Sequence, residues 1–319
     1  MKNWLRFAIA CIAVGVVGMS IFGFEFGDER LAYEKEFAFP EAGIHSLVMR
    51  TDNSTNIKFV PTEEDQITVL FTGKWHQDAI DRIEQTKPEG STLTMDTTAE
   101  DSFQFLSFNL DFSDNHIEVR MPSDKILDEL IVDNISSSNN ITGVKAQHVS
   151  ISSTSGDFEL EDVQASQLAV RLSSGNLDMK NVIAKESASF EMISGDIELE
   201  DLTSSQIAVK LQSGSIEAAA IQGQLEVKST SGDIEIDDLH GDASIEVQSG
   251  NVEVSQSVIG NLDIRAVSGD VEVIAAPDFA GFYDVQAVSG SIHAPDSPRS
   301  GTELIKVRTT SGNIQIEQP

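Results

Sequence analysis

A short motif recurs along the second half of this 319-residue chain: Ser-Gly, then Asp, Asn or Ser, then an aliphatic-acid-aliphatic triplet. It reads STSGDIEIDD at 229–238, VQSGNVEVSQ at 247–256 and AVSGDVEVIA at 266–275. Successive copies are separated by 17 to 22 residues, with a mean of about 19, which lies at the short end of solenoid repeats. The aligned corner positions are Asn139, Gly156, Gly175, Gly195, Gly214, Gly232, Gly250, Gly269, Gly290 and Gly312.

Each repeat predicts two strands joined by tight turns. Apolar and polar residues alternate on both sides of the corner, and Val and Ile dominate the apolar positions. Gly and Asn tolerate a positive φ best, so the corner is expected to need that backbone conformation. We therefore predict an all-β fold, a parallel β-solenoid of about ten coils of about 19 residues each.

The residues before the repeats are β-rich but less regular, and they predict an N-terminal cap on the solenoid. The stretch VMRTDNSTNIKF at 48–59 resembles the last repeat and predicts a divergent first coil. Residues 75–85 predict a short helix. Such a cap is expected because an open solenoid end is a bare strand edge.

The start of the chain predicts one transmembrane helix. Residues 7–24 carry no charge, which is close to the shortest stretch that spans a bilayer. Lys2 and Arg6 precede this stretch and Glu25 follows it, so the positive-inside rule places the C-terminal part outside a bacterial plasma membrane. The expected divisions are a cytoplasmic N-terminus (1–6), an anchor (7–24), a stalk (25–40), a β-rich cap (41–125) and the solenoid (126–319).

The start of the chain has two other interpretations. A cleaved signal peptide is the first, but no small-x-small cleavage site follows the apolar run. Lipidation of Cys11 is the second, but only residues 7–10 would form the apolar region, which is shorter than the usual ~7–15 residues. Cys11 is the only cysteine, so no disulfide can form within the chain.

Two outward positions of the repeat should form charged rows along the stack. The position three residues after the corner is acidic in seven coils: Glu159, Asp178, Glu198, Glu217, Glu235, Glu253 and Glu272. The position four residues before the corner is mainly basic: Ser152, Arg171, Glu191, Lys210, Lys228, Glu246, Arg265, Gln286 and Arg308. The two rows lie on consecutive strands, though not necessarily on one face, and solvent-exposed sheet surfaces that keep the protein soluble account for them. The functional alternative is a strip that binds cations, polyamines or cationic peptides.

The residue that follows the corner alternates between Asp and a neutral residue from Asn140 to Ser291. We interpret this row as turn capping, because Asp, Asn and Ser side chains bond to backbone groups in turns. Ca²⁺ is the alternative, but it needs about six to eight oxygen ligands and alternate coils supply few. No cofactor is therefore expected.

Two Ala-Pro-Asp insertions lengthen the last coils, at 274–285 and 292–307. They fall at the same place in the coil, so two loops should bulge side by side. This predicts a candidate contact patch of Asp278, Phe279, Phe282, Tyr283, His293, Asp296 and Arg299. A C-terminal cap is the structural alternative.

Charge and motif content narrow the range of functions. Acidic residues outnumber basic ones 52 to 21, a net charge of −31, which argues against nucleic acid as a partner. The six histidines show no metal-ligand spacing, and neither a Gly-x-Ser-x-Gly elbow nor a phosphate loop occurs. We therefore predict that the chain is not an enzyme. A polysaccharide lyase or hydrolase built on a β-helix is the alternative.

The Ser-Gly coils, the preceding strand of the type IAVKLQSG and the N-terminal span together resemble a bacterial family. It is the putative-adhesin domain family, which includes LiaG-like and YvlB-like envelope proteins, and the resemblance covers roughly 41–319. It implies a membrane-anchored, outward-facing β-solenoid linked to envelope-stress operons, with no catalytic residues to transfer. We expect a non-catalytic, adhesin-like module that binds cell-wall polymer or an envelope protein. An accessory subunit of a membrane signalling complex is a further alternative.

Overall fold

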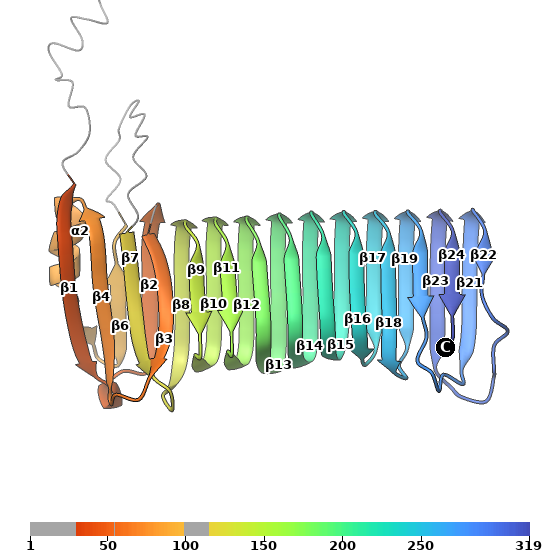
Figure 1. Ribbon diagram of the computed structural model, residues 1–319, viewed down its shortest axis with the longest axis horizontal. Coiled ribbons are helices and arrows are strands. Elements are labelled where there is room, and N and C mark those ends of the chain that lie inside the picture. The colour runs from red at the N-terminus through yellow and green to blue at the C-terminus, as the bar shows by residue number, and fades with distance from the viewer. Residues whose placement is uncertain (1–29, 54, 99–114) are drawn as a thin grey trace, which may run out of the picture.

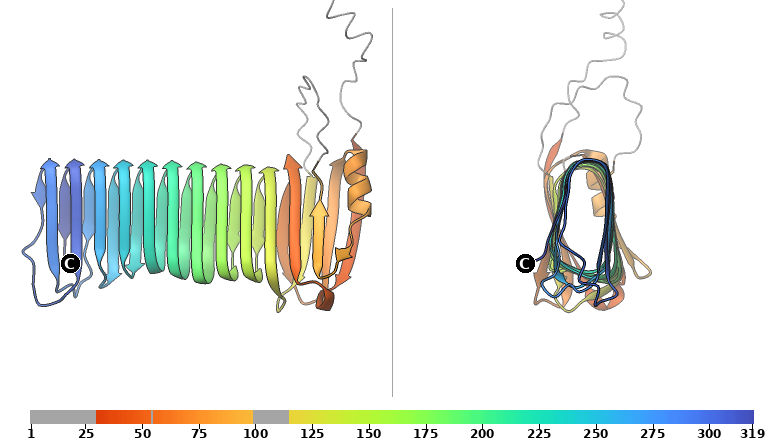
Figure 2. Two further views of the ribbon diagram at one scale, coloured as in Figure 1. Left: turned by 180° about the vertical axis from the view of Figure 1, so that it is seen from behind. Right: turned by 90° about the vertical axis from the view of Figure 1, so that its right-hand side faces the viewer.

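The computed structural model describes residues 30–53, 55–98 and 115–319, and these form one long parallel β-solenoid (Figure 1). The coils superpose end-on as a narrow oval with two flat sides (Figure 2). The predicted all-β solenoid of about ten coils is thus confirmed. The predicted transmembrane helix at 7–24 lies outside the described residues, and no helix within them has the length and apolar character needed to cross a membrane.

Each interior coil contributes one strand to each side of the oval. The strands that lead into the Ser-Gly corners form face A: β8 (Ile126–Ser136), β10 (Lys145–Ser155), β12 (Gln164–Ser174), β17 (Ala243–Ser249) and β19 (Leu262–Ser268). The strands that leave these corners form face B: β9 (Asn139–Thr142), β11 (Phe158–Glu161), β16 (Ile234–His240), β18 (Val252–Val258) and β20 (Val271–Ile274). Three strands start on face B, turn and continue onto face A: β13 (Leu177–Ser194), β14 (Ile197–Ser213) and β15 (Ile216–Ser231).

The core lies between the two faces and consists of alternate side chains of every strand. Val209 of β14, for example, lies beside Val227 of β15, and both are buried. Phe158 and Phe190 are the largest buried side chains of the interior coils. Each fully buried side chain of this size contributes about 1.5–3 kcal/mol. The core therefore depends on the stacking of neighbouring coils, as in other solenoids.

The Ser-Gly corners stack directly on one another and allow no side chain at the glycine. Gly232 has φ +125°, and a Cβ there would lie 1.6 Å from the carbonyl oxygen of Gly214 in the preceding coil. This confirms the predicted positive φ and adds a steric reason for glycine. The first corner was aligned wrongly, because Gly156 stacks on Ser137 and not on Asn139. Asn139 instead faces inward, where its Oδ1 accepts a hydrogen bond from the backbone N–H of Ile57 at 3.0 Å.

The opposite corner uses a second, non-glycine solution. Five residues six positions after the corner glycines adopt a left-handed conformation, with φ between 52° and 56°: Asp162, Asn181, Asp201, Ala220 and Asp238. Asn and Asp are the side chains that tolerate this conformation best, while alanine does not favour it. This row was not predicted from the repeat pattern.

The N-terminal end confirms the predicted divergent coil and closes the stack. β2 (Ser46–Asn53) pairs with β8 and β3 (Thr55–Thr62) pairs with β9, so 46–62 form a coil beside 126–142. Outside them lie β6 (Thr92–Asp96) and β7 (Asn115–Pro122). Antiparallel strands complete the cap: β4 (Gln66–Trp75), β1 (Leu31–Pro40) and β5 (Pro88–Glu89). The cap therefore begins earlier than the predicted residue 41, because residues 31–40 of the predicted stalk (25–40) pair with β4. The predicted short helix is α2 (Gln77–Glu84), which directly follows β4 in the chain. A one-turn 3-10 helix (Glu41–Gly43) connects β1 to β2.

The C-terminal end departs from sequential stacking. β23 (Leu304–Ser311) pairs with β19 on one side and with β21 (Phe282–Ser289) on the other. On face B, β24 (Ile314–Glu317) likewise pairs with β20 and with β22 (Ile292–His293). The last coil of the chain is therefore inserted before the coil that precedes it in sequence. The coil of β21 and β22 forms the outer end of the stack (Figure 1).

Candidate functional site

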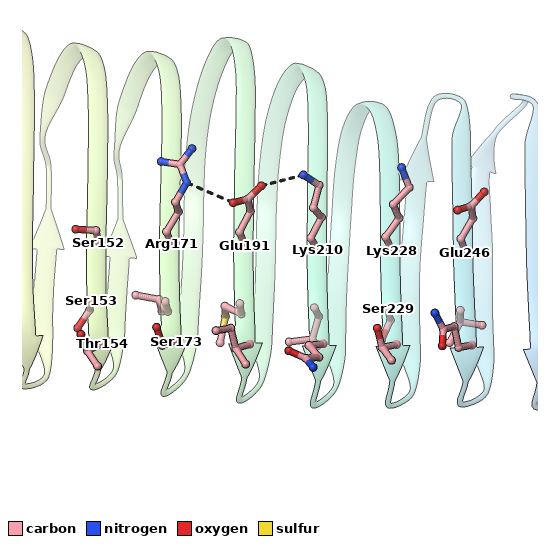
Figure 3. Close-up of a pocket in the computed structure, with 18 of the residues that line it drawn as sticks. Ser152, Ser153, Thr154, Arg171, Ser173, Glu191, Lys210, Lys228, Ser229 and Glu246 are labelled. Atoms are coloured by element: carbon pink, nitrogen blue, oxygen red, sulfur yellow. Dashed lines mark hydrogen bonds and ion pairs between the residues drawn. The ribbon is translucent and has the colours of Figure 1, made fainter.

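A groove of about 990 Å³ follows the outside of face A beside the Ser-Gly corners (Figure 3). Its lining comes from eight face A strands, from β8 to β19. Because neighbouring parallel strands lie about 4.8 Å apart, seven steps give a length of about 34 Å. The groove crosses the strands and follows the axis of the solenoid, so its shape suits an elongated ligand.

One wall of the groove is the row of charged side chains four residues before each corner. Its members within the groove are Arg171, Glu191, Lys210, Lys228, Glu246 and Arg265. The other wall lies two residues before the corner and mixes hydroxyl, amide and apolar side chains, among them Ser173, Gln212 and Thr230. Ile193 and Val267 in this wall are both 55% exposed. Leu172, Met192, Leu211 and Val247 form the buried floor between the walls.

Ion pairs connect neighbouring coils along the charged wall. Nε of Arg171 lies 3.3 Å from a carboxylate oxygen of Glu191, and Nζ of Lys210 lies 2.9 Å from the other oxygen (Figure 3). The hydrogen bond and the charge of Lys210, followed by the charge and hydrogen bond of Arg171, hold the pKa of Glu191 below its ordinary value. This carboxylate therefore stays ionised and fixes two cations of the groove.

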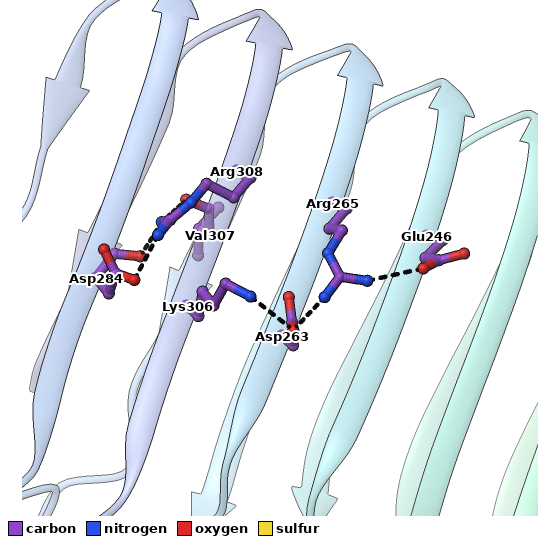
Figure 4. A network of polar contacts seen from close by, with 7 residues as sticks. All are labelled: Glu246, Asp263, Arg265, Asp284, Lys306, Val307 and Arg308. Atoms are coloured by element: carbon purple, nitrogen blue, oxygen red, sulfur yellow. Dashed lines mark hydrogen bonds and ion pairs between the residues drawn. The ribbon is translucent and has the colours of Figure 1, made fainter.

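A second, separate group of ion pairs begins at Glu246 and extends past the groove towards the C-terminal end (Figure 4). Arg265 donates to Glu246 at 2.9 Å and to Asp263 at 2.7 Å. Lys306 on the inserted β23 donates to the same Asp263 at 3.1 Å, and Arg308 is paired with Asp284 of β21. Ion pairs therefore connect β19 to the inserted coil and the inserted coil to the last one.

Lys210 and Lys228 are direct neighbours across β14 and β15 and place two like charges in the middle of the groove. Lys228 is paired with Glu226 beside it, and that hydrogen bond raises the pKa of Lys228. The lining itself holds four basic and two acidic side chains, and Glu226 and Asp263 beside it pair with Lys228 and Arg265. Solvent-exposed ion pairs are weak, so an anionic ligand can compete for these lysines.

The predicted acidic row lies on face B, away from the groove. Its members pair in register from Glu159 to Glu272 through six successive contacts between coils. Burial, followed by repulsion from Asp237, Glu253 and Glu217, raises the pKa of Glu235. Burial, followed by repulsion from Asp157 and Glu159, raises that of Asp178. The two faces therefore differ: face A balances its charges, and face B accumulates negative charge.

The row that follows the corner has a structural role between coils. The backbone N–H of Ser215 donates to Oδ1 of Asp196 at 2.8 Å, and that of Asn251 donates to Oδ1 of Asp233 at 2.8 Å. Hydrogen bonds from Ser215 hold the pKa of Asp196 below its ordinary value. These side chains cap the backbone of the neighbouring coil, whereas the sequence pattern suggested capping within the same turn. In the described part of the chain, no cluster of His, Cys, Asp and Glu side chains could hold a metal ion.

The predicted contact patch is only partly a surface. Phe279 is 2% exposed, and the centroid of its ring lies 5.0 Å from that of Tyr283. It therefore belongs to the core and cannot serve as a contact residue. Tyr283 is half-buried and donates to Gln318 at 3.0 Å. The remaining five predicted residues are exposed: Asp278, Phe282, His293, Asp296 and Arg299. The two insertions do lie side by side, since the N–H of Arg299 donates to the carbonyl oxygen of Gly281 at 3.1 Å.

The repeat pattern predicts the charged wall as a row, but it does not predict the groove. The missing signal was the second row, two residues before the corner, where Ile193 and Val267 are exposed apolar residues in a polar context. Exposed apolar side chains beside a charged row are a recognised feature of binding grooves.

These features define a capped parallel β-solenoid with a charged groove along one face. The chain belongs to the Toastrack DUF4097 family, which matches residues 44–224 and 167–317. This match confirms the family resemblance predicted from the repeated corners. Among curated proteins, none matches this chain.

Three solved structures are similar to the chain over most of its length. A putative adhesin from Bacteroides fragilis is 12% identical, with 89% of this chain and 97% of that chain covered and a TM-score of 0.40. One from Parabacteroides distasonis is 13% identical, with coverages of 90% and 98% and a TM-score of 0.37. A putative cell adhesion protein from Clostridium sporogenes is 9% identical, with coverages of 91% and 100% and a TM-score of 0.22. These similarities are too low to transfer a function.

Proposed function

We propose that this chain is a membrane-anchored, extracytoplasmic binding module of the bacterial cell envelope that holds an elongated anionic polymer in the groove of face A. The observation that carries the proposal is the course of the groove across eight strands, because such a site matches a linear ligand better than a compact one. The module is non-catalytic in this proposal and positions its ligand without changing it. The resemblance to LiaG-like proteins supports a role in the response to envelope stress.

The charge distribution supports an anionic ligand. Lys210 and Lys228 project from adjacent coils into the groove, while the acidic row occupies the opposite face. Phosphate or carboxylate groups of a wall polymer would be attracted to the groove and repelled from face B. The exposed Ile193 and Val267 in the opposite wall would contact the apolar faces of sugar or polyol units.

The anchor predicted at residues 7–24 is the argument for the proposed location. Residues 7–24 are uncharged and follow Lys2 and Arg6, so insertion would leave the solenoid outside the plasma membrane. A rigid solenoid next to that membrane could reach polymer of the cell wall. The acidic surface would keep it away from anionic lipid headgroups.

Binding of the full chain in mild detergent to poly(glycerol phosphate), with dextran as the neutral polymer, tests the proposal. The double variant Lys210→Gln/Lys228→Gln should weaken binding at least about tenfold, because it removes both central cations. Lys180→Gln is the matched control, since Lys180 is an exposed, ion-paired lysine on face B. Equal binding by the double variant and the control would refute the groove as the site. Depolymerisation of either polymer would restore the enzyme alternative.

A further inference from the structure

The charged wall of the groove carries carboxylates as well as cations, and the order of its charges is the same from either end. Six side chains lie in register on six neighbouring strands, each one coil from the next. The row is symmetric in charge about the midpoint between its two lysines (Figure 3). Along the stack its members are Arg171, Glu191, Lys210, Lys228, Glu246 and Arg265.

Each carboxylate of this row lies between cations of the two neighbouring coils. Because adjacent strands are about 4.8 Å apart, each glutamate lies about 7 Å from the midpoint of the lysine pair, and each arginine about 12 Å from it. The side chains of the glutamates are open to solvent, Glu191 at 39% and Glu246 at 46%. The groove therefore presents a positive centre, a negative position on either side of it and a positive position at each end.

A purely anionic polymer fits this row poorly. To bind along the groove, it would draw the cations away from Glu191 and Glu246 and leave both carboxylates unpaired beside its own negative charges. Like charges at this spacing repel each other. With Glu226 and Asp263 beside the lining, carboxylates equal the four basic side chains of the groove in number. The groove therefore favours a ligand that carries both signs of charge.

A polymer with charges of both signs satisfies the whole row. Its ammonium groups would pair with the two glutamates, and its anionic groups would pair with the lysines between them and with the arginines at the ends. Every ion pair that opens is then replaced by one to the ligand, and exposed pairs are weak enough to exchange in this way. Gln212 and Thr230 on the opposite wall are exposed beside the lysines and can donate hydrogen bonds to the central anionic group.

We propose that the ligand of the groove is a zwitterionic polymer, a chain with anionic backbone groups that also carries ammonium substituents. This inference rests on the proposed function, because it assigns the ligand class of the same groove. One anionic group would lie between Lys210 and Lys228, and one ammonium group would lie against each of Glu191 and Glu246. Because the row is symmetric in charge, the polymer can bind in either direction.

Equilibrium binding of the full chain in mild detergent to three forms of poly(glycerol phosphate) tests this proposal. The first form is unsubstituted, the second carries alanyl esters with free ammonium groups, and the third carries N-acetylated alanyl esters at the same density. The third form matches the second in size and lacks its positive charge. At about pH 6, where glutamate side chains are ionised, the second form should bind at least about fivefold more tightly than either of the others.

The double variant Glu191→Gln/Glu246→Gln should remove this preference. It should weaken binding of the ammonium-bearing polymer and strengthen binding of the unsubstituted one, so that their affinities differ by less than about twofold. Glu198→Gln/Glu253→Gln is the matched control, since both glutamates are exposed members of the acidic row on face B. It removes the same two charges from the chain and should retain the preference.

The outcomes separate this proposal from the proposed function. Equal, measurable binding of all three polymers by the wild type would overturn the zwitterionic ligand and leave the groove as a site for anionic polymers. A preference that persists in Glu191→Gln/Glu246→Gln would also overturn it, because ammonium groups would then be recognised elsewhere on the chain. Failure of all three polymers to bind would refute both proposals.

Discussion

The backbone N–H of Gly269 donates a hydrogen bond to the carbonyl oxygen of Ser311 at 3.0 Å, although the coil at 282–293 lies between them in sequence. The N–H of Gly312 then donates to the carbonyl oxygen of Ser289 at 2.9 Å. The C-terminal residues therefore hold the preceding coil in place, and within the described ranges that coil pairs with β23 and β24 and not directly with the interior of the solenoid.

Deletion of residues 304–319 should consequently release more than the deleted coil. β21 and β22 would lose β23 and β24, the strands with which they pair, so the backbone amides of 282–293 should exchange hydrogen rapidly. Hydrogen exchange followed by mass spectrometry measures this, with a deletion of Pro319 alone as the control. Continued protection of 282–293 would mean that this coil can stack directly on β19, contrary to the prediction.

Gly232→Ala should destabilise the solenoid by at least about 3 kcal/mol, because the new Cβ meets the backbone of the neighbouring coil and the residue has a positive φ. Gly43→Ala is the control, since nothing lies within 4 Å of a Cβ at Gly43. Denaturant unfolding monitored by circular dichroism compares the two. Similar midpoints for both variants would contradict the steric account of the corner.

Ala220→Asn should stabilise the protein by about 0.5–1 kcal/mol, because Ala220 adopts φ 55° in a row otherwise made of Asp and Asn. Asp201→Ala in the neighbouring coil should have the opposite effect of similar size, since it places alanine at φ 56°. Thermal unfolding of the two single variants provides the test. A loss of stability in Ala220→Asn would show that the left-handed backbone does not govern this corner.

The acidic row predicts a gain in stability in mild acid. The pKa of Glu235 is raised, so its ionised form weakens the folded state, and this effect fades as the pH falls from neutral towards the ordinary glutamate value of 4.5. The pKa of Glu191 is lowered, so the stability that it contributes is present above 4.5 and is lost as the pH falls through its folded-state value. Stability should therefore pass through a maximum between neutral pH and the ordinary glutamate pKa.

Two substitutions separate these contributions. At neutral pH, Glu235→Gln should raise the melting temperature and Glu191→Gln should lower it. Each change in the free energy of unfolding should be less than about 1 kcal/mol, because both sites are near the surface. Glu235→Gln should also reduce the gain in mild acid. Melting curves at several pH values and at low and high salt measure both effects. An unchanged pH profile in Glu235→Gln would remove the acidic row as its cause.

The repeat made the coils, their strands and both charged rows predictable, because a glycine recurs at each corner from Gly156 to Gly312, where the stacked backbones leave no room for Cβ. The first corner was misplaced because Ser137 stands where the other coils have glycine, and the pattern then favoured Asn139. The order of the last two coils was not predictable, since Gly290 and Gly312 carry the same corner pattern. Periodicity shows that a segment forms a coil, and it does not show where in the stack that coil lies.

The groove and the second corner were missed for another reason. Ala220 and Asp238 look like ordinary surface residues until the backbone shows their left-handed conformation. Phe279 looked like a surface contact because it lies in a Pro-containing insertion, but it covers the open edge of the core beside Tyr283. The groove, the left-handed corner and the burial of Phe279 each depend on which segments contact one another in the folded coil. A single sequence does not show those contacts.

The inserted coil at one end and the displaced first coil at the other have a consequence for how such a protein can change length. Between residues 145 and 274, neighbours in sequence are neighbours in the stack, so a duplicated coil of about 19 residues could be accommodated there without altering either end. A coil added after residue 319 would emerge from the second-last layer and find both of its sides already occupied. Lineages of this fold should therefore gain and lose whole coils from the middle of the chain, while the two ends are inherited as fixed units.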